Sequence, residues 1–196
     1  MKKRIALTLL GILYFGAPSK TLEETINFGV ESSLEEIIET IENLPNKEIK
    51  KYKKIYEILE EEYKKLDNFP PYFDLDILSR LIYAESRYNE KAVSRNNAKG
   101  LMQLKRSAWY QVEKNLDYDE NVFNPRMNIR VGLKYILWID EYCRKKHQEW
   151  DSLEDKEKRK IVLAAYNAGA FRVFSRNWDI SKMPKETREY IKYFDE

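Results

Sequence analysis

Apolar residues recur at intervals of three and four along most of this chain, which is the spacing of one face of an α-helix. No stretch alternates apolar and polar residues in the way that predicts a β-strand. The predicted fold class is therefore all-α. The predicted helices cover residues 33–44, 47–66, 75–85, 101–112, 128–146, 155–167 and 184–190.

The segment Asn68–Tyr72 (NFPPY) is the clearest boundary, because consecutive prolines do not continue a helix. Before it we predict a helical hairpin in an N-terminal extension over residues 20–71, and after it a main helical domain over residues 72–196. Asp74, Asn128 and Asp155 are predicted to cap the helices that follow them. Residues 86–99 and 113–127 are predicted to be loops.

The first 19 residues have the pattern of a signal peptide. Lys2, Lys3 and Arg4 form a basic start, residues 5–15 form an apolar run, and small residues follow up to Ser19. The run is shorter than the span of about 20 residues that crosses a membrane. We predict export to the periplasm or cell envelope, with residues 1–19 cleaved or kept as an anchor.

The balance of charge changes once this segment is set aside. The chain has 35 basic and 33 acidic residues, and three of the basic residues lie in residues 1–19, which hold no acids. The remaining 32 basic and 33 acidic residues give a net charge of −1. This near-neutral balance, without a recognisable motif, argues against nucleic-acid binding.

Histidine and cysteine are almost absent, with His147 and Cys143 as the single examples. Nucleophiles activated by an imidazole and zinc sites built from Cys and His are therefore disfavoured. One cysteine also excludes an intramolecular disulfide. We predict no metal and no cofactor, and we expect a monomer.

Glu85 is the candidate for chemistry. It continues the apolar stripe of Leu78 and Ile82, because these positions follow the i, i+4, i+7 spacing of one helix face. Burial favours the neutral form of a carboxyl and raises its pKa, as a general acid near neutral pH requires. Taken alone, a glutamate on an apolar face is more often a structural carboxylate than a catalytic one.

Several short strings accompany Glu85 in a fixed order, and together they resemble the catalytic domain of the soluble lytic transglycosylases, lysozyme-like enzymes that cut bacterial peptidoglycan. The resemblance covers residues 72–194. The strings are Glu85-Ser86 with Asn89, Ala92–Ser94, Ala98–Gln103 (AKGLMQ), Asn124-Pro125 with Asn128, Ile129 and Gly132, Ala164–Gly169 (AAYNAG) and Pro184–Tyr190 (PKETREY).

The resemblance implies a lysozyme-like helical domain with Glu85 as its single catalytic acid. In that family the acid protonates the β1,4 glycosidic oxygen between N-acetylmuramic acid (MurNAc) and N-acetylglucosamine (GlcNAc), and then takes a proton from the muramic 6-hydroxyl as a 1,6-anhydro ring closes. The matching substrate-binding positions are Ser86, Ser94, Met102, Gln103, Tyr166, Asn167 and Tyr190. Ordinary helix and turn roles for the two serines, and a core role for Met102, stay open.

The sequence departs from the family pattern at three places. Glu90 stands where a proline is common and Asn97 where glycine is common. After Gln103 the chain reads Leu104–Ala108 (LKRSA) instead of a turn containing Met-Pro. These differences concern loop geometry and specificity, and none of them removes a catalytic group.

Two alternatives from other classes remain. A muramidase on the same fold, resembling goose-type lysozymes, would need a second carboxylate to activate water, and Asp117, Asp119 and Glu120 are the candidates. A non-catalytic wall-binding module would use the helices of residues 33–66 to dock a protein of an envelope machine. An intact Glu85 argues against the second alternative.

Overall fold

The computed structural model describes residues 46–195, which are helical and contain no strand. The predicted signal peptide, the helix over residues 33–44 and the rest of the segment before residue 46 lie outside the described residues. The all-α prediction is confirmed for the described part. Two isolated bridges in the chain between α5 and α6 join Lys99 to Val93 and to Leu104.

The elements are α4 (Asn46–Tyr63), α5 (Leu75–Ser86), α6 (Arg106–Val112), α7 (Tyr118–Asn121), α8 (Pro125–Lys146), the 3-10 turn η1 (Trp150–Ser152), α9 (Asp155–Ala168), α10 (Ala170–Phe174), the 3-10 turn η2 (Ile180–Lys182) and α11 (Lys185–Lys192). The longest connections between the elements are residues 64–74 and 87–105, on either side of α5.

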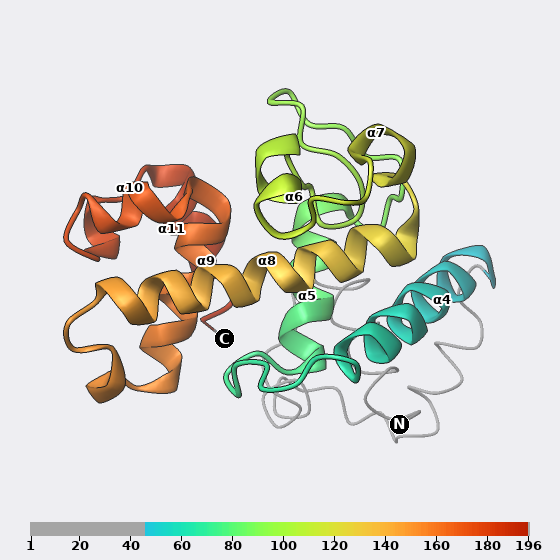
Figure 1. Ribbon diagram of the computed structural model, residues 1–196. Helices are drawn as coiled ribbons and strands as arrows, with labels where there is room; N and C mark the ends of the chain where they lie inside the picture. The colour runs from blue at the N-terminus through green and yellow to red at the C-terminus, as the bar shows by residue number, and fades with distance from the viewer. Residues whose placement is uncertain (1–45, 196) are drawn as a thin grey trace, which may run out of the picture.

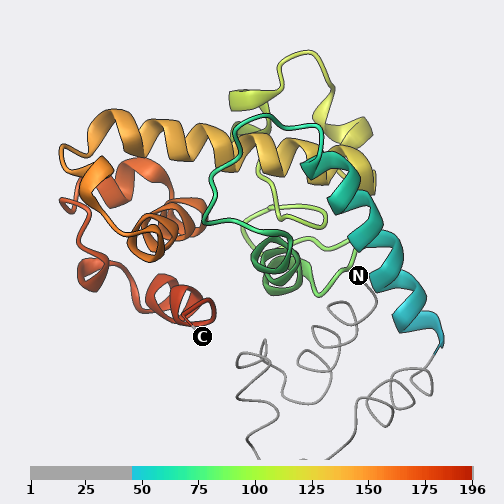
Figure 2. The same ribbon diagram turned by 90° about the horizontal axis from the view of Figure 1, so that it is seen from below.

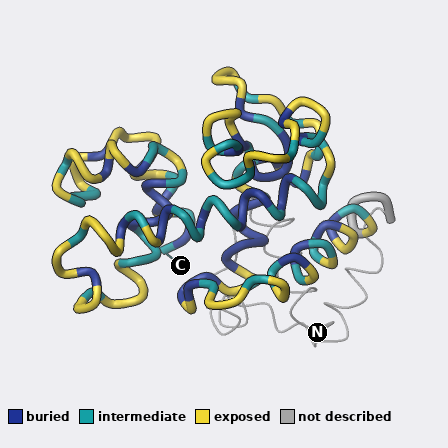
Figure 3. The backbone as a smooth tube through the Cα atoms, viewed as in Figure 1, coloured by how far each residue is buried: buried dark blue, intermediate teal, exposed yellow. Residues whose placement is uncertain are grey.

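The long helix α8 organises the domain. It packs against α4 and α6 along one part of its length and against α9 and α10 along another, while α11 packs on α9 (Figures 1 and 2). Buried residues concentrate on α5 and along the middle of α8 (Figure 3). The core therefore lies where the surrounding helices meet α8.

Helix α4 packs on this core through its apolar face. Tyr52, Ile55 and Leu59 are almost fully buried, and α4 contacts both α8 and α5. Glu62, whose side chain is only 2% exposed, accepts hydrogen bonds from Arg126 and Arg130 on α8 at 2.8 Å each. Burial alone would raise the pKa of Glu62, but hydrogen bonds from Arg130, Lys65 and Arg126 lower it to about 2. The predicted division of the chain at residue 71 stays a prediction.

Several predicted boundaries were wrong. Residues 101–105 are not helical, since α6 begins only at Arg106, and α7 interrupts the loop predicted over residues 113–127. Asn128 does not cap α8, because Asn124 accepts from the Arg126 and Met127 backbone N–H groups and Pro125 opens the helix. Asp155 does not cap α9, because it is the first residue of that helix and Glu154 is the N-cap residue. The Glu154 backbone N–H donates to the Glu157 carboxylate.

None of the helices in residues 46–195 combines the length and the low charge that crossing a membrane requires.

Candidate active site

Glu85 lies near the end of α5, on the side of that helix that faces the core. The predicted cap is confirmed, because the Asp74 carboxylate accepts from the Ile77 backbone N–H at 2.9 Å. Leu78 and Ile82 are completely buried below the acid, whereas Glu85 itself is only partly covered. The Glu85 carboxyl therefore lies at the boundary between the core and the solvent.

The hydroxyl of Tyr190 on α11 donates to Glu85 Oε1 at 2.7 Å. Burial raises the pKa of Glu85 to about 7, and the hydrogen bond from Tyr190 only partly opposes that rise. A carboxyl with this pKa exists in both protonation states near neutral pH, so it can donate a proton in one step and accept one in the next.

The chain then turns away from α5 through two residues in left-handed conformation, Arg87 and Tyr88, with φ of 50° and 56°. The Tyr88 side chain is buried, and its hydroxyl donates to the Ser79 carbonyl at 3.2 Å. This turn directs the following residues across the domain toward α8.

Asn128 on α8 fixes the segment Gly100–Gln103. Its side chain accepts from the Met102 backbone N–H at 2.8 Å and donates to the Val122 and Lys99 carbonyls at 2.8 and 3.2 Å. A Cβ at Gly100 would lie 2.2 Å from the Asn128 amide nitrogen. Gly100 is therefore required for the backbone to approach this amide so closely.

Gly132 provides room for the Met102 side chain one turn further along α8. A Cβ at Gly132 would lie 2.2 Å from the Met102 sulfur, and Met102 is completely buried. The structure thus places this methionine in the core, as the alternative interpretation of its sequence position allowed.

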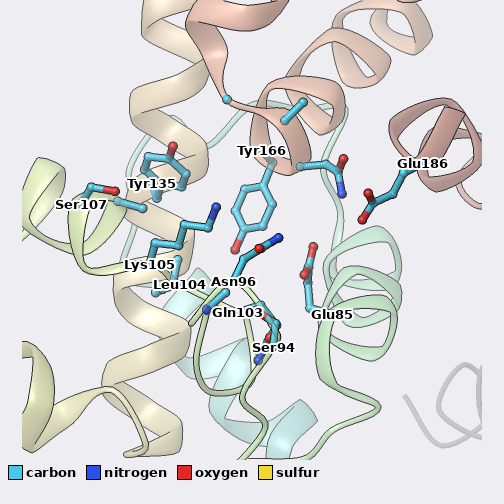
Figure 4. Close-up of a pocket in the computed structure, with 15 residues that line it drawn as sticks. Glu85, Ser94, Asn96, Gln103, Leu104, Lys105, Ser107, Tyr135, Tyr166 and Glu186 are labelled. Atoms are coloured by element: carbon cyan, nitrogen blue, oxygen red, sulfur yellow. Dashed lines mark hydrogen bonds between the residues drawn. The ribbon is translucent and has the colours of Figure 1, made fainter. Parts of the chain in front are cut away.

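Glu85 lines a pocket of about 430 Å³. The pocket lies between α5, α8, α9, α11, the start of α6 and the segment that precedes α6 (Figure 4). Figure 4 shows Tyr166 between the acid on one side and Lys105 on the other. The lining residues are Glu85, Ser94, Asn96, Ala98, Gln103, Leu104, Lys105, Ser107, Ala108, Tyr135, Tyr166, Asn167, Ala168, Gly169 and Glu186.

These features agree with the comparisons to known proteins. The sequence profile of the family described as "Transglycosylase SLT domain" matches residues 70–191. This chain belongs to that family.

The domain is also similar to two known proteins. It is 30% identical over 111 residues to "Membrane-bound lytic murein transglycosylase F" of Pseudoalteromonas translucida, a match that covers 53% of this chain and 21% of that protein. An X-ray structure of an inactive variant of lytic transglycosylase Slt from Pseudomonas aeruginosa superposes with a TM-score of 0.52 at 22% identity, over 69% of this chain and 22% of that one. The second match shows a shared fold. The SLT domain described here corresponds to about a fifth of each relative's length.

Of the residues predicted for the SLT site, Glu85, Ser94, Gln103, Tyr166 and Asn167 line the pocket. Tyr190 reaches the site through its hydrogen bond to Glu85. Ser86 and Met102 do not belong to the lining. The Ser86 hydroxyl donates to the Ile82 carbonyl at 3.0 Å within its own helix.

The side chains predicted to bind substrate also hold the walls of the pocket together. Gln103 donates its amide to the Gly100 carbonyl at 2.8 Å, and Ser94 Oγ accepts from the Ala98 backbone N–H at 3.0 Å. Asn167 Oδ1 accepts from the Thr187 hydroxyl at 2.9 Å, which ties α9 to α11. Tyr166 donates to the Met102 carbonyl at 2.6 Å and not to Glu85. Tyr190, rather than Tyr166, is therefore the tyrosine that is hydrogen-bonded to the Glu85 carboxyl.

Sequence reasoning missed several lining residues. Asn96, Lys105, Ser107, Tyr135 and Glu186 all face the pocket. Glu186 lies inside the PKETREY string, which could have marked it, because that string also supplies Tyr190. Tyr135 carries no such signal, since an aromatic residue on a packed helix is more often part of a core.

The candidate second carboxylates of the muramidase alternative do not line the pocket. Asp117 caps α7 by accepting from the Glu120 backbone N–H at 3.0 Å, and Asp119 pairs with Arg106 and Lys99. Glu186 is instead the second carboxylate of the pocket, and its side chain is exposed. Across the described residues, no three His, Cys, Asp or Glu side chains cluster as a metal site would require.

Proposed function

We propose that this SLT domain is a lytic transglycosylase that cleaves the β1,4 bond between MurNAc and GlcNAc in peptidoglycan. The product is a strand that ends in a 1,6-anhydro muramic ring. The observation that carries the proposal is the Glu85 carboxyl, which lies in a pocket, is hydrogen-bonded by Tyr190 and has a pKa raised to about 7 by burial. Membership of the SLT family supports the substrate and the reaction class.

The reaction needs one group that changes roles. Glu85 in its acid form gives its proton to the glycosidic oxygen as the bond from the muramic C1 to that oxygen breaks. The muramic 6-hydroxyl oxygen then bonds to C1, and its proton returns to the Glu85 carboxylate. No water is consumed, and the enzyme ends the cycle in the protonation state in which it began.

The surroundings of Glu85 suit both proton transfers. Burial stabilises the neutral acid before bond breaking, while the Tyr190 hydroxyl stabilises the carboxylate that follows. Tyr166 and Tyr135 contribute rings 5.7 Å apart that line the same pocket, and such rings can pack against the apolar faces of sugars.

Mass spectrometry of the fragments released from purified peptidoglycan sacculi tests the proposal. The expected products carry 1,6-anhydro ends, and the Glu85→Gln variant is expected to release none while remaining folded by circular dichroism. Fragments with reducing ends alone would refute the transglycosylase reaction, and full activity in the variant would refute the role of Glu85.

A muramidase is the second candidate, because Glu186 brings another carboxylate to the pocket. An inverting hydrolase places its two carboxyl groups roughly 6.5–9.5 Å apart, with water between them. If Glu186 is the base, Glu186→Gln abolishes the release of reducing ends. If Glu85 acts alone, that variant still forms anhydro products.

For the location we propose the cell envelope, on the strength of the predicted export signal and of a relative whose name describes it as membrane-bound. The structure of α4 restricts the alternative of a wall-binding module that docks a partner through residues 33–66. Its apolar residues Tyr52, Ile55 and Leu59 are buried against the domain, so only its charged side is available to a partner.

A further inference from the structure

Lys105 places a cation at the pocket. It lies in the LKRSA segment, where the sequence departs from the Met-Pro turn, and it lines the same pocket as the acid. Figure 4 shows Lys105 on the side of Tyr166 away from Glu85 and Glu186. The pocket therefore has a cationic end and an anionic end.

The neighbouring cations are already neutralised by the protein. Arg106 pairs with Asp119, and Lys99 lies 3.8 Å from the same carboxylate. Lys99 also lies over the rings of Tyr118 and Phe123. Within residues 46–195, by contrast, no hydrogen bond or ion pair joins the Lys105 ammonium to another group. Its charge remains available to a ligand.

We propose that Lys105 binds a carboxylate carried by the peptidoglycan strand, which makes it a specificity-determining residue for charged substrate. This inference rests on the proposed function. The sugar rings and acetamido groups of the strand are uncharged, so a carboxylate has two sources. One is the lactyl group of a muramic residue without a peptide, and the other is a stem peptide attached to that lactyl group.

An exposed lysine contributes only modestly to the affinity for a carboxylate ligand. Its ammonium is a point charge on a flexible stem, and exposed ion pairs are weak and screened by salt. Partial enclosure by the pocket walls strengthens a charge-assisted hydrogen bond above that level. Loss of the charge is therefore expected to weaken binding by roughly three- to tenfold at low ionic strength.

Binding measured without turnover tests the proposal. The proteins are Glu85→Gln alone, Glu85→Gln with Lys105→Met, which keeps a long unbranched side chain, and Glu85→Gln with Lys105→Arg. Glu85→Gln with Lys156→Met is the matched control, since Lys156 is exposed on α9 ten residues before Tyr166, about 15 Å along the helix. The ligands are three MurNAc-GlcNAc oligomers with the lactyl group as free acid, as neutral methylamide or bearing a stem peptide.

Two results support the proposal and also identify the carboxylate. A Lys105→Met loss confined to the free-acid oligomer assigns the lactyl carboxylate, and a loss confined to the peptide-bearing oligomer assigns the stem peptide. In either case Lys105→Arg restores most of the affinity, and the loss shrinks in about 0.5 M salt. An equal loss on the methylamide, or no loss on any ligand, overturns the proposal.

The outcome is separable from that of the proposed function. Analysis of the products released by the wild-type protein tests the reaction, whereas the binding titrations use proteins that carry Glu85→Gln. If sacculi yield no anhydro fragments but the charge-dependent loss appears, the carboxylate site stands and the reaction falls. If anhydro fragments appear without a charge-dependent loss, the reaction stands and the Lys105 site falls.

Discussion

Replacing Glu85 by glutamine is expected to stabilise the fold above neutral pH. The Glu85 pKa is about 7 in the folded protein against an ordinary value of 4.5. Between these values the folded chain holds a proton that the unfolded chain has released, so the free energy of unfolding falls as pH rises through this window. At about 1.4 kcal/mol for each pKa unit, ionised Glu85 costs up to about 3 kcal/mol above pH 7.

Glutamine removes this cost because it does not titrate, and its carbonyl can still accept the Tyr190 hydroxyl. The variant is expected to match the wild type at about pH 4 and to exceed it by about 3 kcal/mol at about pH 8. Urea unfolding at several pH values measures the difference. Glu186→Gln is the control for loss of an exposed carboxylate in the same pocket. A stability gap between the Glu85 variant and wild type that does not grow with pH would refute the buried-acid argument.

Three further substitutions test other contacts. Tyr190→Phe removes the hydrogen bond that lowers the Glu85 pKa, so the high-pH limb of the activity profile should move to higher pH and turnover should fall roughly tenfold; an unchanged profile would contradict this. Glu62→Ala leaves Arg130 without its carboxylate and Arg126 with Glu61 alone. Urea unfolding should show a loss of about 2 kcal/mol, less than for a fully buried pair because both arginines are about a third exposed. Gly132→Ala drives a methyl into the Met102 sulfur and should lower the free energy of unfolding by about 1–3 kcal/mol; thermal unfolding should show a smaller loss when the same change is made in a Met102→Ala background.

The features that the sequence predicted correctly are local ones. The stripe that carries Glu85 depends only on helical spacing, and the Asp74 cap depends on a polar residue three positions before an amide. Both follow from residues within one helix. The ordered family strings extended this local information to Tyr166, Asn167 and Tyr190.

What sequence reasoning missed depends on tertiary contact. Asn128 was interpreted as a cap, because asparagine favours caps, yet its amide is buried and bonds to backbone groups of residues 99, 102 and 122. In the sequence Lys105 cannot be distinguished from other surface lysines, and only the fold shows that it lines the pocket with Glu85. Glu186 lies in the same sequence string as Tyr190, but only the fold shows that it lines the pocket.

The hydrogen bond between Tyr190 and Glu85 joins groups that are 105 positions apart in the sequence. Glu85 on α5 is synthesised well before Tyr190 on α11. Because the contact needs both helices docked, a nascent or truncated chain without α11 lacks the environment that orients the acid. The order of the helices in the chain therefore delays completion of the site until α11 has been synthesised and has docked beside α5.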